Sequence, residues 1–204
     1  TKKIKYLSKI DFNNVIKTLL FHKFELKNEN YSLKVILDDD NDSNIRTEIM
    51  GLPNIQYYCK NNSIKGIEDI QNIKFVEKKY FQKDDVVFYP LDYDEYNMRV
   101  SFQVEENFNM YDEKIKTIIK KWDSTKKIFR FVKRFEFKHP ELPFNIHCSI
   151  VKMSKQSSGK ITSHFNINDS NVFNAFENYE VEIEFINPDI GLKTKFETGH
   201  YLYE

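Results

Sequence analysis

The chain has 204 residues, a length that fits one domain with a sizeable hydrophobic core. Its 31 basic and 31 acidic residues balance, so nothing in the overall charge attracts nucleic acid, and anion binding requires local segregation of charge. Two distant cysteines, Cys59 and Cys148, argue against a disulfide framework and a zinc site, and the short apolar runs argue against a membrane span or a signal peptide. We therefore expect a soluble, intracellular domain with no membrane contact.

Hydrophobic periodicity predicts an α+β chain made mostly of strands. Apolar residues at helical spacing indicate helices at residues 8–24, 55–59 and 112–122, and Ser8 or Asp11 is placed to cap the first. Alternating residues indicate strands at 31–37, 43–50, 73–82, 97–105, 126–139, 144–152 and 179–186. We expect the acidic stretch 38–42 to be a turn and the Ser-, Gly- and Asn-rich stretch 154–174 to be flexible.

Alternation along these strands separates charged side chains from apolar ones. Four arginines fall on polar strand faces in this way, and a guanidinium can chelate phosphate oxygens bidentately. They are Arg46, Arg99, Arg130 and Arg134. An isolated arginine on a strand is more often a surface residue, so it is the repetition on several strands that favours an anion site.

Residues 179–185 read Tyr-Glu-Val-Glu-Ile-Glu-Phe, so alternation places Glu180, Glu182 and Glu184 on one strand face. Successive carboxylates on such a face lie about 7 Å apart, and their charges repel. If the face points inward, a hard cation such as Mg²⁺ or Mn²⁺, or basic side chains, must compensate the charge. If it points to water, the glutamates form a solvated strand face, which is ordinary for an antiparallel sheet.

A closed antiparallel barrel would use these faces together, with apolar residues packed outward under helices and charged residues lining the lumen. The acidic run, followed by Ile186 and Asn187, resembles the C-terminal metal-binding strand of triphosphate tunnel metalloenzymes. Within that family it resembles the RNA 5′-triphosphatase domain of large DNA virus mRNA capping enzymes. Strand patterns at 44–49, 98–102, 129–134 and 146–152 precede it in the family's order and extend the resemblance over nearly the whole chain.

The resemblance implies a fold and a function. Residues 1–204 would form one closed triphosphate tunnel of about eight antiparallel strands with a few covering helices. The activity would be metal-dependent removal of the γ-phosphate of nascent mRNA, the first step of cap formation, with Mg²⁺ or Mn²⁺ as cofactor. The partners would be the 5′-triphosphate end of RNA and the guanylyltransferase and methyltransferase domains of the same polypeptide or complex, in the cytoplasm (viral factory) or the virion.

The resemblance also assigns roles to individual residues. Glu180, Glu182 and Glu184 would bind the metal. The phosphates would be held by Arg46, Arg99, Arg130, Arg134 and Lys152. The catalytic residues would be Glu182, Glu184, Arg130 and Arg134.

Two departures from the family pattern stand out. The family has an N-terminal strand with a Glu-x-Glu pair that completes the metal site, and Glu25 with Glu29 is a poor substitute for it. We therefore expect the chain to be the N-terminal part of a larger capping enzyme without that first acidic strand. His147 stands where an Asp is expected beside a hydroxyl residue such as Ser149, and a structural histidine there is as reasonable as one that tunes activity.

Other readings stay open on the sequence. One is a noncatalytic tunnel module that binds polyphosphate or scaffolds capping domains. A second is another tunnel enzyme, such as a polyphosphate polymerase, a nucleotide cyclase, a thiamine triphosphatase or a nucleoside triphosphatase. A third is a β-rich domain with an exposed glutamate face. Whether the arginine and glutamate faces converge distinguishes the last reading from the others.

Overall fold

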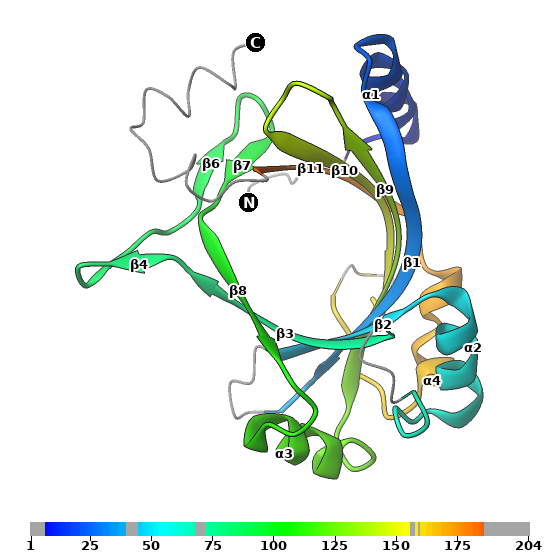
Figure 1. The fold of residues 1–204 in the computed structure, drawn as a ribbon. Helices are drawn as coiled ribbons and strands as arrows, with labels where there is room; N and C mark the ends of the chain where they lie inside the picture. The colour runs from blue at the N-terminus through cyan, green and yellow to red at the C-terminus, as the bar shows by residue number, and fades with distance from the viewer. Residues whose placement is uncertain (1–6, 40–44, 68–71, 156–157, 159, 186–204) are drawn as a thin grey trace. The chain divides into compact units, whose positions relative to one another are not determined.

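The computed structural model describes residues 7–39, 45–67, 72–155, 158 and 160–185 (Figure 1). The fold is mostly β, and seven strands hydrogen-bond in the order β11-β10-β9-β1-β2-β3-β8. Every registered strand pair among them is antiparallel. Across the described ranges, β11 and β8 are the two edge strands of this sheet. The sheet is therefore open there, whereas the sequence predicted a closed barrel.

The helices are α1 (Lys9–Phe21), α2 (Leu52–Asn61), α3 (Glu113–Lys121), α4 (Ile167–Ser170) and the 3-10 helix η1 (Val172–Asn174). The seven strands of the large sheet are β1 (Glu25–Leu37), β2 (Ile45–Met50), β3 (Ile73–Tyr80), β8 (Gln103–Phe108), β9 (Lys127–Lys138), β10 (Phe144–Met153) and β11 (Asn178–Phe185). Two separate hairpins consist of β4 (Gln82–Lys83) with β5 (Val86–Val87), and of β6 (Leu91–Tyr93) with β7 (Met98–Val100). No helix in these ranges is both long and apolar enough to span a membrane.

The structure confirms most of the elements expected from periodicity and corrects two. The three predicted helices and six of the predicted strands are present with shifted ends, and Ser8 caps α1 by accepting a hydrogen bond from the Asp11 N–H. The stretch 154–174, expected to be flexible, instead contains α4 and η1, because Ile167 and Val172 are buried there. The predicted strand 97–105 is divided into β7 and the start of β8. Residues 40–42 of the predicted turn lie outside the described residues.

The chain divides into two compact units. We call the first unit the described parts of residues 32–131 and 152–175, and the second unit residues 7–31, 132–151 and 176–185. Three strands of the large sheet, β1, β9 and β10, contribute residues to both.

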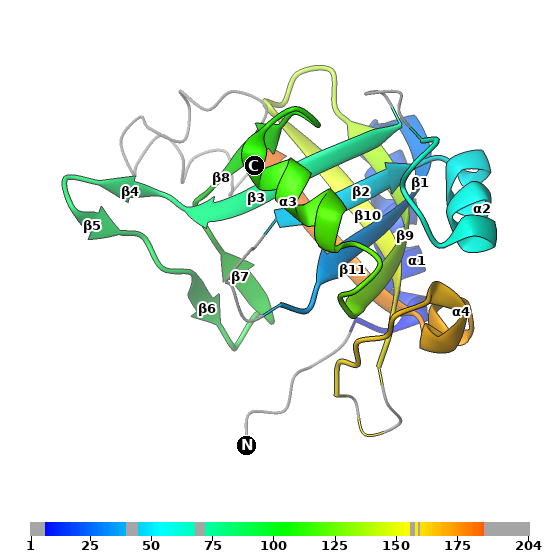
Figure 2. The ribbon, with the colours of Figure 1, turned by 90° about the horizontal axis from the view of Figure 1, so that it is seen from below.

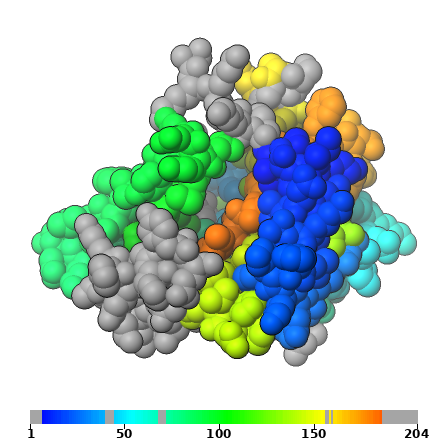
Figure 3. Space-filling model, turned by 90° about the horizontal axis from the view of Figure 1, so that it is seen from above, coloured from blue at the N-terminus to red at the C-terminus, as the bar shows by residue number. Residues whose placement is uncertain are grey.

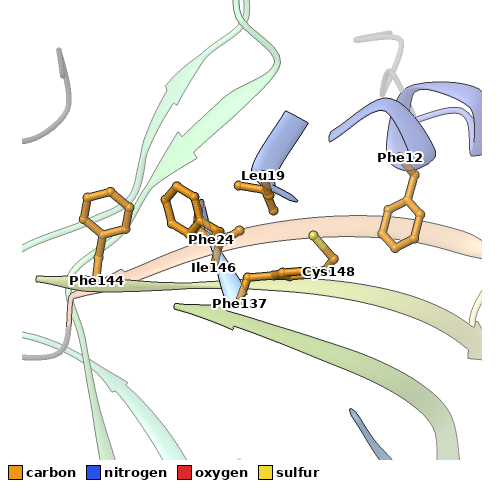
Figure 4. Close-up of a cluster of buried hydrophobic side chains, with 7 residues drawn as sticks. All are labelled: Phe12, Leu19, Phe24, Phe137, Phe144, Ile146 and Cys148. Carbon is orange, nitrogen blue, oxygen red and sulfur yellow. The ribbon is translucent and has the colours of Figure 1, made fainter. Parts of the chain in front are cut away.

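In the second unit, α1 packs on the apolar side chains of the strands (Figure 4). The buried cluster consists of Phe12, Leu19, Phe24, Phe137, Phe144, Ile146 and Cys148. Phe12 also lies 5.0 Å from the ring of Tyr179 on β11. Burial raises the pKa of the Cys148 thiol to about 11, and both cysteines are free, as expected from their spacing. Because this core occupies one face, the alternate residues of β9, β10 and β11 project from the other.

In the first unit, strict alternation divides β2 into a buried and a half-buried row. Ile45, Thr47 and Ile49 are buried, and Arg46 and Glu48 alternate with them. The ring of Tyr58 on α2 lies edge-on to Trp122 at 6.1 Å and near Phe129 at 6.3 Å, so the helices cover the apolar row. The charged row is left on the opposite side of the strand, as the sequence predicts.

Between β3 and β8 the chain leaves the large sheet and forms the two short hairpins (Figure 2). Asp84 and Asp85 join β4 to β5 with φ values of 49° and 63°, the left-handed conformation that a two-residue type I′ turn requires. Asn97 closes the loop before β7 with φ 52°. These turns explain why the 97–105 strand is interrupted, since Met98 and Arg99 pair back on β6 instead of joining the large sheet.

We expect Phe137→Ala to lower the free energy of unfolding by about 3–5 kcal/mol, because it removes a buried ring that α1 packs against. Phe21→Ala, which truncates a ring on α1 that is 83% exposed, is the matched control and should change stability by about 0.5 kcal/mol or less. Urea unfolding followed by circular dichroism measures both. Equal losses in the two variants would contradict the assignment of this core.

Candidate functional site

The polar face of the second unit carries the three predicted glutamates. In the β10–β11 register, Glu180 lies opposite Ser149, Glu182 opposite His147 and Glu184 opposite Asn145. Residues paired in this way point to the same side of the sheet, so the glutamates share a face with Ser149 and His147. Ser149 is fully buried and His147 is 8% exposed. A face with buried polar residues is not a plainly solvated strand surface.

Arg134 joins this face to β9. Its Nη2 lies 2.8 Å from Glu182 Oε2, and its Nε donates to Ser149 Oγ at 3.2 Å. The guanidinium therefore contacts β10, the neighbouring strand, and reaches across it to β11, where Glu182 is the glutamate that it neutralises. The structure thus brings together two of the residues predicted to be catalytic, Arg134 and Glu182.

His147 lies between two carboxylates on the same face. Its Nδ1 is 3.4 Å from Glu184 Oε2, and its Nε2 is 4.0 Å from Glu136 Oε1. Asn145 donates from Nδ2 to the same Glu136 oxygen at 3.1 Å. Glu136 and Asn145 were missed by the sequence reasoning, because only the register between β9, β10 and β11 shows that they join the glutamate row.

The charge on this face is predominantly negative. Four carboxylates, from Glu136, Glu180, Glu182 and Glu184, share it with one guanidinium and one imidazole. Carboxylate oxygens are the donors that Mg²⁺ and Mn²⁺ prefer, so the donor chemistry fits a hard cation. Within the described ranges no three carboxylate, histidine or cysteine side chains converge as a cage, and the donors remain spread along the strand.

The first unit has a charged group of its own on β1, β2, β3 and β8. Glu48 Oε1 accepts from Arg46 Nε at 2.6 Å and lies 3.3 Å from Lys34 Nζ. Glu105 Oε1 lies 2.7 Å from Lys78 Nζ and 3.9 Å from Arg46 Nη2. Arg46 therefore sits among both carboxylates, in a group with three cations and two anions. Of these residues only Arg46 was predicted as a phosphate ligand.

Glu48 is a largely buried carboxylate whose charge is held by its neighbours. Burial alone would raise the pKa of Glu48, but the charges and hydrogen bonds of Lys34 and Arg46 outweigh it, and the pKa is lowered. The folded state therefore favours the ionised carboxylate of Glu48. This ion pairing holds the Arg46 guanidinium in place on β2.

The other predicted phosphate ligands lie elsewhere. Arg99 is on the β6–β7 hairpin, where Nε and Nη2 bind Asp92 in a two-pronged pair at 2.7 and 3.1 Å. Lys152 donates to the Phe173 carbonyl at 3.0 Å. Arg130 is half-buried on β9 in the first unit. The structure does not bring Arg99 or Lys152 into the charged group around Arg46, as judged from the described contacts.

Glu25 and Glu29 on β1 bind lysines instead of joining the glutamate row. Glu25 pairs with Lys27, and Glu29 lies 2.9 Å from Lys133 Nζ. Lys133 alternates with Arg134 along β9 and contacts the rings of Tyr31 and Phe135, so it occupies the face opposite Arg134. Both carboxylates therefore have lysine partners on β1 and β9, and the absence of the first acidic pair stays a prediction.

The fold built from these antiparallel strands is shared with solved structures of viral RNA triphosphatase domains. The chain matches the RNA triphosphatase domain of a trifunctional mimivirus mRNA capping enzyme with a TM-score of 0.59 and 17% identity, over 98% of this chain and 84% of that one. A triclinic structure of the mimivirus capping enzyme triphosphatase matches with a TM-score of 0.56 and 17% identity, over 98% and 85%. At this identity the likeness establishes the fold. No protein-family model and no curated protein matches the chain.

We expect Glu48→Gln to destabilise the protein by about 1–3 kcal/mol at neutral pH, because it leaves Lys34 and Arg46 without their buried counter-charge. The lowered pKa of Glu48 gives the sign of the pH dependence. The carboxylate stabilises the native state above its unfolded pKa, and this contribution is lost as pH falls through the lower folded pKa.

The difference in stability between wild type and Glu48→Gln should therefore shrink on acidification. Urea unfolding of both proteins between neutral pH and the acid limit measures it. A difference that stays constant or grows towards low pH would contradict the assignment.

Proposed function

We propose that this chain is a metal-dependent RNA 5′-triphosphatase that removes the γ-phosphate from nascent mRNA in the first step of cap formation. The observation that carries the proposal is the face on which Arg134 reaches Glu182 within a row of glutamates, in a chain with the fold of a viral RNA triphosphatase domain. A cationic group next to clustered carboxylates offers both partners that a triphosphate–metal complex needs. Closure of the sheet into a tunnel stays a prediction.

In this proposal Glu180, Glu182 and Glu184 hold Mg²⁺ or Mn²⁺. When bound, the metal would offset the negative charge of the γ-phosphate and of the β-phosphate, which leaves as part of the RNA. The glutamates can serve this role because carboxylate donors lie on one face and repel each other without a counter-charge. Either Glu182 or Glu184 would orient the attacking water.

Arg134 holds the central position among the proposed catalytic residues. Without substrate its guanidinium neutralises Glu182. With substrate, the same guanidinium would bind phosphate oxygens, and the Glu182 carboxylate released from this ion pair would be one of the residues that hold the metal. The Ser149 hydroxyl keeps the guanidinium positioned from the other side. Arg46, Arg99, Arg130 and Lys152 stay as proposed phosphate ligands, with Arg130 also proposed to be catalytic.

The partners follow from the same proposal. The mimivirus structure belongs to a trifunctional capping enzyme. By analogy with it, the substrate here would be the 5′-triphosphate end of RNA, and guanylyltransferase and methyltransferase domains would act next on the product. The place of action would be the cytoplasmic viral factory or the virion.

A noncatalytic polyphosphate-binding module is the second candidate. It is favoured by His147, because an imidazole lies within reach of Glu136 and Glu184 where the resemblance leads us to expect an aspartate. Such a module would retain Arg134 and bind tripolyphosphate without turnover. Isothermal titration with tripolyphosphate, with and without Mg²⁺, detects this binding directly.

We expect Glu182→Ala to reduce γ-phosphate release from 5′-triphosphate RNA by about 100-fold or more, because it removes a metal ligand and the partner of Arg134. Glu106→Ala is the matched control. Glu106 has the same 50% side-chain exposure, and it pairs with Lys79 at the same 2.8 Å as Glu182 with Arg134. The control should retain wild-type activity.

The assay is run with Mg²⁺, with Mn²⁺ and with chelator, and ATP and thiamine triphosphate are included to detect another tunnel enzyme. A wild-type chain that binds tripolyphosphate through Arg134 but releases no phosphate would move the conclusion to the noncatalytic module. Equal activity in wild type and Glu182→Ala would remove the glutamate row from the mechanism.

A further inference from the structure

Glu184 differs from Glu182 in its partner. Glu182 is paired with the guanidinium of Arg134, whereas no lysine or arginine of the described residues pairs with Glu184. Its described partner is the imidazole of His147, whose Nδ1 lies 3.4 Å from Glu184 Oε2. The side chain of Glu184 is 67% exposed, and β11 (orange-red) reaches the surface beside α1 (blue) in the space-filling view (Figure 3). A dissolved ion can therefore reach this carboxylate.

His147 is a buried imidazole whose hydrogen-bonding capacity the fold does not use. The residue is 8% exposed, and within the described residues neither ring nitrogen makes a hydrogen bond. Ser149 on the same face is also buried, yet its hydroxyl accepts a hydrogen bond from Arg134. Buried polar groups are nearly always hydrogen-bonded or bound to a ligand, so an unused imidazole beside an accessible carboxylate indicates a ligand site.

The separation of His147 Nδ1 and Glu184 Oε2 suits two ligands of one metal ion. Ligands on adjacent corners of an octahedron, each about 2.1 Å from the ion, lie about 3 Å apart. The observed 3.4 Å is close to that spacing, and the exposed Glu184 side chain can rotate to close the difference. No third protein donor converges on this pair within the described ranges, so water and phosphate oxygens complete the coordination.

The other ring nitrogen of His147 faces a carboxylate of β9. Nε2 lies 4.0 Å from Glu136 Oε1, and Asn145 Nδ2 donates to that same oxygen at 3.1 Å, which holds the carboxylate beside the ring. A histidine that binds a metal commonly donates its second N–H to a carboxylate, which fixes the tautomer. Glu136 is placed to accept that N–H, and the lone pair of Nδ1 is then left for an ion beside Glu184.

We propose that His147 binds the divalent cation together with Glu184, and that its nitrogen makes the site favour transition-metal ions such as Mn²⁺ and Co²⁺ over Mg²⁺. Mg²⁺ takes oxygen donors and keeps most of its water, whereas imidazole is a ligand of first-row transition metals. A row of carboxylates alone discriminates less between these ions. The inference rests on the proposed triphosphatase site, but it concerns metal binding, which is measured without turnover.

Metal binding to the purified chain, without RNA, is the first test. Isothermal titration with MgCl₂, MnCl₂ and CoCl₂ should give dissociation constants that decrease in that order. Electron spin-echo envelope modulation of bound Mn²⁺ should show coupling to a directly bonded nitrogen, a signal that carboxylate ligands cannot give. Mn²⁺ bound without nitrogen coupling, Mg²⁺ bound as tightly as Mn²⁺, or no binding of any of the three ions would overturn the proposal.

Substitutions separate the ligand from its neighbours. His147→Asn offers an amide oxygen in place of the ring nitrogen, so it should weaken Mn²⁺ binding by about tenfold or more, abolish the nitrogen coupling and remove most of the preference over Mg²⁺. Glu136→Ala removes only the carboxylate behind the ring, so Mn²⁺ affinity should fall by about tenfold while the coupling remains. Nitrogen coupling that survives His147→Asn would assign the ligand to another residue and overturn the proposal.

His139→Ala is the matched control for these variants. It removes a half-buried imidazole of the same unit that contacts Phe24 and accepts a hydrogen bond from the Glu141 N–H, outside the glutamate row. This variant should bind all three metals as wild type does. Circular dichroism confirms that each variant is folded, and the wild-type spectrum tests the nitrogen ligand without any substitution.

Release of γ-phosphate from 5′-triphosphate RNA, measured with the same metals, separates this inference from the proposed function. Mn²⁺ bound through nitrogen without hydrolysis would support the role of His147 and remove the triphosphatase function. Hydrolysis that is equal in Mg²⁺ and Mn²⁺ and unchanged in His147→Asn would support the triphosphatase and overturn the role of His147.

Discussion

Eight residue pairs align β10 with β11, from Phe144 opposite Phe185 to Val151 opposite Asn178. Side chains alternate with a period of two, so a slip of one residue would turn Glu180, Glu182 and Glu184 towards the apolar face. The apolar cluster of β10 and α1 opposes such a slip, because polar or charged side chains would then replace Tyr179 and Phe185, which pack against it. Packing on one face of the second unit therefore fixes the position of the acidic row on the other.

Given that register, the charged residues need counter-charges from neighbouring strands. Arg134 provides one for Glu182, and Lys34 with Arg46 provide one for Glu48. The two arrangements differ in burial. The side chain of Glu48 is 14% exposed and is paired with both cations, whereas that of Glu182 is 50% exposed. Ion pairs near water are weak, and the proposed mechanism uses this weakness, because in it Glu182 releases Arg134 when substrate binds.

Local patterns in the sequence were sufficient for much of this. Alternation predicted that Arg46 and Glu48 share a face and that the three glutamates of β11 form a row, and the Ser8 cap predicted the start of α1. The sequence was insufficient where pairing between distant strands decides the outcome. Glu105 and Lys78 meet because β8 pairs with β3, and Asn145 joins the site because β10 pairs with β11. Register depends on tertiary packing, which no local window contains.

The hairpins after β3 are a second place where the sequence pattern did not predict the structure. Met98, Val100, Phe102 and Val104 alternate as a buried strand face should, yet three of the four are exposed. The positive φ angles at Asp84, Asp85 and Asn97 turn the chain before it can continue along the sheet, so local turn chemistry outweighs the alternation.

The neutral total charge conceals three local excesses: an acidic row on β11, a cationic group around Arg46 on β1, β2, β3 and β8, and an acidic segment at residues 80–104. The carboxylate row favours a metal cation and the cationic group favours phosphate. The acidic segment and the carboxylate row both repel the phosphate backbone of RNA. Segregation of charge therefore gives a chain of zero net charge some faces suited to cations and others suited to anions.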